Sequence, residues 1–179
     1  MARISPLIAL PPLIFLGLGA LFMVGLNRDD VSSLPSTLEG QQAPSLAVKS
    51  LGELPVITEA ALRKPEVKLV NFWASWCAPC RAEHPNLQVL SELGLPIYGV
   101  NYKDQDAKGL KFLNELGNPY TAVGTDALGR EAINWGVYGI PETFVVDANG
   151  RIILRFAGPI TRRALTATIL PAIKKAQNP

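Results

Sequence analysis

The alternation of apolar and polar positions predicts a series of short strands and helices along the second two thirds of the chain. Short runs rich in apolar and β-branched side chains are typical of buried strands, and they occur at residues 66–72, 96–101, 120–123, 143–147 and 151–156. Apolar residues at helical spacing indicate helices at residues 80–93, 105–116, 127–135 and 161–175. The turn Ala148-Asn149-Gly150 joins the last two strands, because Asn-Gly between apolar runs is a strong hairpin signal.

The order of these elements predicts an α/β fold. Strands connected through helices usually pair in parallel, whereas strands joined by a tight turn pair antiparallel. We therefore expect a central mixed sheet that begins with parallel strands, ends with an antiparallel pair and carries helices on both faces. Pro171 falls inside the last predicted helix, where proline is expected to interrupt the final turn.

The run from Leu7 to Leu26 contains twenty residues without a charge. Twenty helical residues rise about 30 Å, which is the hydrocarbon thickness of a bilayer, so residues 1–26 are predicted to form an N-terminal transmembrane anchor. Pro11 and Pro12 are compatible with a spanning helix. A cleaved secretory signal is the alternative, although its apolar core usually has about 7–15 residues and ends at an A-x-A-like site, which this run lacks.

The charges that flank the apolar run predict its orientation. Arg3 precedes the run, whereas Arg28 beyond it is offset by Asp29 and Asp30. Positive residues tend to stay on the cytoplasmic side, so we expect the N-terminus in the cytoplasm and the rest of the chain outside. Outside means an oxidising compartment such as a bacterial periplasm, where a dithiol needs a source of electrons.

Residues 27–43 read as a linker, because Asp, Ser, Pro, Gly and Gln dominate without a periodic apolar pattern. Residues 44–179 then form the folded domain, which suits a chain of 179 residues with 48% apolar and 18% charged residues. The formal net charge is only +2. Binding to nucleic acid would require a concentrated basic face, so this class of partner is excluded.

The chain has two cysteines, Cys77 and Cys80, and three readings of the pair compete. A structural disulfide closing so short a loop would contribute about 2 kcal/mol, less than a bridge between distant segments. A tetrahedral zinc site needs four ligands, and the two cysteines with His84 supply at most three, so no metal is expected. Redox cycling fits best, because Cys-x-x-Cys at the start of a helix is the arrangement that lowers a thiol pKa.

The spacing also predicts separate roles for the two sulfurs. Cys77 lies near the helix N-cap, where unpaired backbone N–H groups and the helix dipole favour a thiolate. Cys80 lies one turn further on the same face and is expected to be more buried, so it can resolve a mixed disulfide. Pro79 falls in the first helical turn, where its missing N–H costs little. We therefore expect Cys77 to attack and Cys80 to resolve.

The segment Val70-Asn71-Phe72-Trp73-Ala74-Ser75-Trp76-Cys77-Ala78-Pro79-Cys80-Arg81 resembles the active-site segment of thioredoxin-fold proteins. A second signature, Tyr138-Gly139-Ile140-Pro141-Glu142-Thr143, is similar to the cis-proline loop that faces the cysteines in that family. The resemblance covers residues 40–175 and implies a thioredoxin-like fold with a cis Ile140–Pro141 bond. It also implies substrate contacts from Trp76, Tyr138, Ile140 and Pro141 and a redox-active disulfide as the only redox group, with no added cofactor.

Three further motifs resemble the DsbE/CcmG type of these proteins. They are Cys80-Arg81-Ala82-Glu83-His84-Pro85, Gly99-Val100-Asn101-Tyr102-Lys103-Asp104 and Gly136-Val137-Tyr138-Gly139-Ile140-Pro141-Glu142-Thr143-Phe144. The resemblance implies a periplasmic reductase that is anchored by an N-terminal helix in the inner membrane and serves cytochrome c maturation. Its implied partners are apocytochrome c or a thiol-bearing chaperone as substrate, and a transmembrane thiol reductase as electron donor.

One position departs from ordinary thioredoxins, which carry a buried Asp two residues before the tryptophan that here is Trp73. This chain has Asn71, which cannot take a proton from Cys80. Glu83 and Glu142 are the candidate replacements, because a carboxyl whose pKa is raised by burial can accept a thiol proton. The alternative for Glu83 is a solvated helix face.

Two other functions stay open on the sequence. The chain could be a general periplasmic reductase or an oxidant, since the direction of electron flow follows only from the resemblance. It could also be a non-catalytic, membrane-tethered adaptor that binds unfolded chains through the cis-proline loop.

Overall fold

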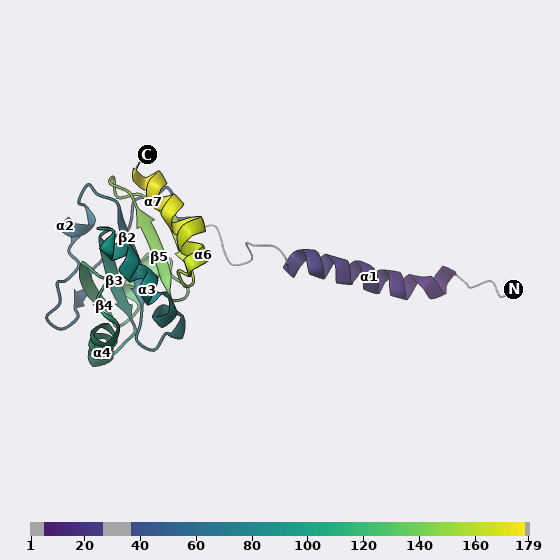
Figure 1. Cartoon of the computed structure of the whole chain (residues 1–179), viewed down its shortest axis with the longest axis horizontal. Coiled ribbons are helices and arrows are strands. Elements are labelled where there is room, and N and C mark those ends of the chain that lie inside the picture. The colour runs from purple at the N-terminus through teal and green to yellow at the C-terminus, as the bar shows by residue number, and fades with distance from the viewer. Residues whose placement is uncertain (1–5, 27–36, 178–179) are drawn as a thin grey trace. The chain divides into compact units, whose positions relative to one another are not determined.

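The computed structural model describes residues 6–26 and 37–177, and Figure 1 shows the whole chain. The chain divides into two units, Met1–Ser33 and Leu34–Pro179. Within its described residues, the first unit contains the helix α1 (Pro6–Leu26), whose side chains are described from residue 10 to residue 25 and are exposed. Within the described residues, no helix is long and apolar enough to cross a membrane, so the predicted transmembrane anchor is not confirmed.

The second unit contains six strands and the remaining described helices. The strands are β1 (Lys49–Ser50), β2 (Lys68–Trp73), β3 (Ile97–Tyr102), β4 (Ala122–Asp126), β5 (Glu142–Val146) and β6 (Ile152–Ala157). The helices are α2 (Glu59–Leu62), α3 (Ala78–Glu92), α4 (Asp106–Leu116), α5 (Arg130–Asn134), α6 (Arg162–Ala164), the π-helical turn η1 (Leu165–Ile169) and α7 (Leu170–Gln177).

The strands form one mixed sheet in the order β1-β4-β3-β2-β5-β6. β2, β3 and β4 pair in parallel through the crossover helices α3 and α4, whereas β5 runs antiparallel to both β2 and β6. This arrangement confirms the predicted mixed α/β sheet and its terminal hairpin. The strand β1 pairs antiparallel with β4 and was not predicted, because only two exposed residues form it.

Side chains alternate between the two faces of the sheet, as strand geometry requires. Leu69 and Trp73 of β2 pack on one face with apolar residues of α3, α4, η1 and α7. Val70 and Phe72 pack on the opposite face with Leu62 of α2 and Ala132 of α5. Figure 1 shows α3 and α7 lying across the strands on the first face. Both faces are therefore covered, as predicted.

The folded unit begins earlier than the predicted domain boundary at residue 44. The backbone N–H of Gly40 donates to the carbonyl of Ile152, and that of Ala43 donates to Gly150. Part of the predicted linker 27–43 thus lies against the β5–β6 hairpin, whereas residues 27–36 lie outside the described part of the chain.

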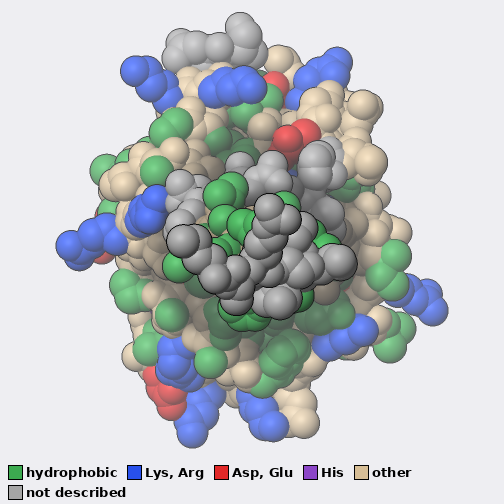
Figure 2. Space-filling view, turned by 90° about the vertical axis from the view of Figure 1, so that its right-hand side faces the viewer, with side chains coloured by type: hydrophobic (Ala, Val, Ile, Leu, Met, Phe, Trp, Pro, Cys, Tyr) green, Lys and Arg blue, Asp and Glu red, His purple; other side chains and the backbone are tan. Residues whose placement is uncertain are grey.

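Two further features bear on the sequence predictions. The last helical region continues past Pro171 to Gln177, with the π-helical turn directly before α7. Figure 2 shows one face of the molecule, where Lys and Arg side chains are spread around the margin and do not gather into one patch. This distribution agrees with the low net charge.

Candidate active site

The two cysteines lie at the start of α3 and form a disulfide. Cys77 is the N-cap residue, and its sulfur accepts a hydrogen bond from the backbone N–H of Cys80 at 3.1 Å. Such an N–H group stabilises a thiolate on Cys77 once the disulfide is reduced. Cys77 is 4% exposed and Cys80 is 2% exposed, so the predicted difference in burial is small. The two residues differ instead in their position in the helix.

The turn before the cysteines, residues 74–77, is held by the loop that follows β3. The Asp104 carboxylate accepts hydrogen bonds from the backbone N–H of Ser75 at 2.6 Å and from its hydroxyl at 2.8 Å. Trp76 is 58% exposed, and its indole N–H donates to the carbonyl of Lys103 at 3.2 Å. Burial would raise the pKa of Asp104, but hydrogen bonds, including those from Asn101 and Ser75, lower it below its usual value. This carboxylate therefore stays charged and fixes the turn.

Glu83 lies one turn beyond Cys80 on α3 and is 1% exposed. The Asn71 side-chain amide donates to one of its oxygens at 2.9 Å, and the backbone N–H of Ile160 donates to the other at 2.9 Å. Burial raises the pKa of Glu83 to about 7, against a partial lowering by these two hydrogen bonds. The carboxyl is thus poised to exchange a proton near neutral pH, and the solvated-face alternative for this residue is wrong.

Asn71 is the centre of a buried hydrogen-bond network on the α3 face of the sheet. Its carbonyl oxygen accepts from the Tyr120 hydroxyl at 2.9 Å, and its amide also donates to the Thr143 hydroxyl at 2.9 Å. These contacts fix the orientation of the amide so that its N–H group points at Glu83. The sequence identified Asn71 only as a missing proton acceptor, whereas the structure shows it as a hydrogen-bond donor to the replacement carboxyl.

Glu142 lies at the start of β5 and is fully buried. Its partner is Arg155 of β6, whose guanidinium donates to the Glu142 carboxylate and, at 2.6 Å, to the carbonyl of Gly136. Burial raises the pKa of Glu142, and the Arg155 guanidinium opposes that rise. The sequence did not identify Arg155, because nothing in its local pattern distinguishes it from an exposed strand residue.

The loop before β5 contains three of the predicted substrate-contacting residues, Tyr138, Ile140 and Pro141. The Ile140–Pro141 bond is cis, as expected. Tyr138 is 59% exposed, and the Arg155 guanidinium lies 4.6 Å from the centre of its ring. Ile140 is partly buried and packs against both hydrophobic clusters. The Tyr138 ring is therefore exposed to solvent and packs against the Arg155 guanidinium.

The His84 side chain packs between α3 and α4. Its Nε2–H donates to the carbonyl of Gly117 at 2.8 Å, and its ring lies edge-on against Phe112. Burial lowers the pKa of this imidazole. Among the residues that the structure describes, no group of three or more His, Cys, Asp or Glu side chains could hold a metal ion.

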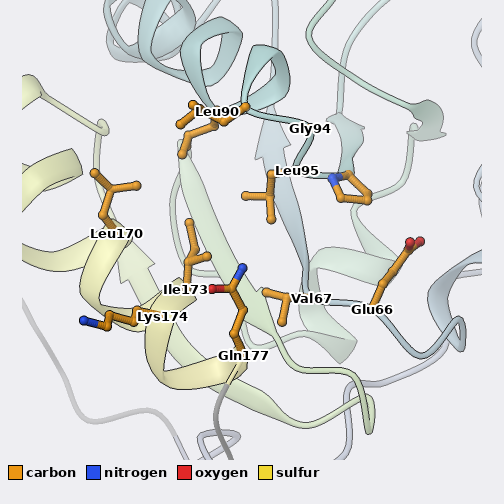
Figure 3. A pocket seen from close by; sticks show the side chains of 11 residues that line it. Glu66, Val67, Leu90, Gly94, Leu95, Leu170, Ile173, Lys174 and Gln177 are labelled. Atoms are coloured by element: carbon orange, nitrogen blue, oxygen red, sulfur yellow. The ribbon is translucent and has the colours of Figure 1, made fainter.

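A pocket of about 660 Å³ lies far from the disulfide. It opens at the C-terminal end of α3, where Figure 3 shows Leu90, Leu95 and Ile173 turned towards the same space. The cysteines occupy the other end of the helix, about 20 Å away at 1.5 Å per residue. This pocket is therefore not part of the disulfide site.

Comparison with known proteins decides the family. The Redoxin family matches residues 38–170. The chain belongs to the Redoxin family. It is 50% identical over 176 residues to the thiol:disulfide interchange protein DsbE homolog of Paracoccus denitrificans, covering 98% of both chains.

Two further relatives support the assignment. The chain is 45% identical over 169 residues to the thiol:disulfide interchange protein HelX of Rhodobacter capsulatus, covering 94% of this chain and 96% of HelX. A solved secreted thiol-disulfide isomerase from Corynebacterium glutamicum superposes with a TM-score of 0.63 and 26% identity, covering 75% of this chain and 86% of that chain. The fold is therefore thioredoxin-like, and the protein is a thiol–disulfide oxidoreductase of the DsbE type.

Proposed function

We propose that this oxidoreductase reduces disulfides during cytochrome c maturation. Its substrates would be the haem-site cysteines of apocytochrome c or a thiol-bearing chaperone, and a transmembrane thiol reductase would return it to the dithiol form. The observation that carries the proposal is the Cys77–Cys80 disulfide at the start of α3, in a chain 50% identical to a DsbE homolog.

The reaction begins with the reduced protein. The Cys77 thiolate attacks one sulfur of the substrate disulfide, and the other substrate sulfur leaves as a thiolate. Cys80 then loses its proton and attacks the Cys77 sulfur, which releases the second substrate sulfur and leaves the Cys77–Cys80 disulfide. Two electrons have passed to the substrate, and the donor reductase restores them.

We assign the proton from Cys80 to Glu83. The two residues are one turn apart on α3, and the pKa of Glu83 of about 7 leaves part of this carboxyl ionised and ready to accept at neutral pH. For Glu142 the geometry supports a positioning role, because the Arg155 guanidinium pairs with one oxygen of its carboxylate. Substrate would lie between Trp76 and the loop of Tyr138, Ile140 and Pro141, with backbone pairing of the kind seen in strand addition.

The finer assignment of location rests on the sequence. Twenty uncharged residues from Leu7 to Leu26 support an uncleaved membrane anchor, and the flanking charges support a periplasmic domain. A redox-active protein held at the membrane would meet a membrane-bound electron donor without having to diffuse to it.

The test traps the natural partner. In Cys80→Ser the resolving sulfur is missing, so Cys77 should stay joined to its substrate, and the adduct can be purified from cells under non-reducing conditions. We expect an apocytochrome c or a cysteine-bearing maturation protein in the adduct. Cys77→Ser is the matched control and should form no such adduct.

The same experiment separates the alternatives. A broad mixture of secreted proteins on Cys77 would indicate a general reductase or an oxidant instead. Cytochrome c maturation that persists in a strain whose only copy is the Cys77→Ser/Cys80→Ser variant would indicate a non-catalytic adaptor.

A further inference from the structure

A second, smaller hollow lies beside the turn that leads into the cysteines. It has a volume of about 240 Å³ and is lined by Ser75, Arg81, Lys108, Lys111, Phe112 and Glu115. We call these six residues the basic hollow. Ser75 precedes Cys77 by two residues and Arg81 directly follows Cys80, so the hollow borders the segment that carries the cysteines.

The lining of the basic hollow carries three cations and a single carboxylate. Glu115 lies 3.8 Å from Arg81 and 3.8 Å from Lys111, and all three side chains are about half exposed or more. Ion pairs of this length and exposure contribute about 0–1 kcal/mol, so they leave the cations available to another anion. Lys108 takes part in none of the ion pairs found among the described residues.

The three cations that line the hollow come from two helices, α3 and α4. Lys108 and Lys111 are three residues apart on α4, which places them on the same face of that helix. Arg81 comes from α3, and its guanidinium lies 4.9 Å from the centre of the Phe112 ring. Three cations thus line one hollow next to the segment of the cysteines, against the Glu115 carboxylate in the lining and the Asp104 carboxylate bonded to Ser75.

The size of the hollow limits what can enter it. Pockets for small-molecule ligands usually have about 300–1,000 Å³, so 240 Å³ suits a side chain of a protein better than a separate small molecule. A transient redox contact is small, and complementary charge at its edge raises the rate of encounter and fixes the orientation.

We propose that the basic hollow binds an Asp or Glu side chain that lies close to the disulfide of the partner protein. The carboxylate enters between Arg81 and Lys108 and brings the partner sulfur to Cys77. This inference rests on the proposed reductase function, and it adds that the partner segment is acidic.

The experiment uses the reduced full-length chain in detergent and two synthetic peptides. Each peptide has one cysteine blocked as a neutral 2-thiopyridyl disulfide, flanked in one peptide by two Asp and in the other by two Asn. Attack by Cys77 releases pyridine-2-thione, whose absorbance gives the rate in a stopped-flow instrument. At low salt we expect the acidic peptide to react about 10-fold faster than the neutral one, and the ratio to approach 1 at 1 M NaCl.

Charge reversal locates the effect. Lys108→Glu/Lys111→Glu should reduce the ratio of the two rates to about 1 or below, whereas the matched double reversal Lys174→Glu/Lys175→Glu on α7 should keep it near 10. Equal rates for both peptides with the unmodified chain at low salt, or a ratio that survives the α4 reversal, would overturn the inference and leave the reductase function intact. If neither peptide reacts, the proposed function itself fails.

Discussion

Two buried carboxylates lie in the segments that carry the cysteines and the cis-proline, on opposite faces of the same sheet. Glu83 reaches the face covered by α3, where its hydrogen-bond partners are the neutral amide of Asn71 and the backbone N–H of Ile160. Glu142 starts β5 on the side of Phe144 and Val146, which pack on the opposite face, and its partner there is the guanidinium of Arg155. The two carboxyl groups are thus similarly buried, but Glu83 has neutral hydrogen-bond donors around it whereas Glu142 has a cation.

The difference separates two roles that the sequence assigned jointly. A carboxyl surrounded by neutral donors can gain and lose a proton within the neutral pH range, as Glu83 does. For Glu142, the Arg155 guanidinium opposes the rise in pKa that burial causes, and the ion pair joins β5 to β6. We therefore propose that proton transfer takes place on the α3 face, and that the Glu142–Arg155 pair on the opposite face positions the loop of Tyr138, Ile140 and Pro141.

The largest expected effect follows removal of Arg155. In Arg155→Met the Glu142 carboxylate stays buried without its cation, which typically costs about 3–5 kcal/mol of unfolding free energy. Without the cation, the folded-state pKa of Glu142 rises further above its unfolded value. The stability that depends on protonated Glu142 is therefore present in acid and is lost as the pH rises, so the loss should be greater at pH 8 than at pH 5. Urea unfolding at both values measures it.

Two further variants serve as a control and as a rescue for this prediction. Arg162→Met removes an exposed arginine and should change the unfolding free energy by less than about 0.5 kcal/mol. Glu142→Gln in the Arg155→Met background removes the uncompensated charge and should recover much of the loss at pH 8. A loss that is no larger than in Arg162→Met would show that the pair does not stabilise the fold.

The next effect is the pH dependence of the unfolding free energy that comes from Glu83. Its folded-state pKa of about 7 lies above its ordinary value of 4.5, so its protonated form contributes stability below pH 4.5, and this contribution is lost as the pH rises through 7. A difference of this size corresponds to about 3 kcal/mol at most. The unfolding free energy of the unmodified chain should therefore fall relative to that of Glu83→Gln between pH 4.5 and pH 8.

The pH dependence is the informative quantity here, because Gln at position 83 also disturbs the hydrogen bonds to Asn71 and Ile160. Glu92→Gln, at the exposed end of the same helix, is the control and should give a curve parallel to that of the unmodified chain. If the curve of Glu83→Gln is parallel as well, Glu83 does not titrate in the neutral range and the proton transfer must use another group.

Much of the fold could be predicted because its signals are local. The order of strands and helices, the Asn149-Gly150 hairpin and the helix that starts at the cysteines each depend on a few consecutive residues. The two-residue strand β1 and the contacts of Gly40 and Ala43 with the hairpin could not, because backbone hydrogen bonds to distant segments define them and leave no periodic pattern.

The site divides in the same way. The Cys77–Cys80 pair carries its chemistry in its spacing, and Glu83 follows from helical geometry once α3 is placed. Arg155 reaches Glu142 only through the register of β5 with β6, which contains an irregularity between Val145 and Val146. No local pattern encodes such a register, so the partner that distinguishes the two carboxylates could come only from the structure.

The smallest expected effect concerns the network that supports Glu83. In Tyr120→Phe the Asn71 carbonyl oxygen loses its buried donor, which should cost about 1–3 kcal/mol of unfolding free energy. The Asn71 amide is then less firmly oriented, so its hydrogen bond to Glu83 weakens.

This hydrogen bond lowers the pKa of Glu83, so the titration of that carboxyl should move upwards in Tyr120→Phe. Nuclear magnetic resonance of labelled glutamate carboxyl carbons measures the shift directly. Tyr98→Phe is the matched control, because the Tyr98 hydroxyl donates to the carbonyl of Ala61 at 3.3 Å, away from Glu83. That variant should cost stability without moving the titration. If both variants leave the titration of Glu83 unchanged, Asn71 does not depend on Tyr120 for its orientation, and the hydrogen bond to the carboxyl on the α3 face is held by other contacts of the amide.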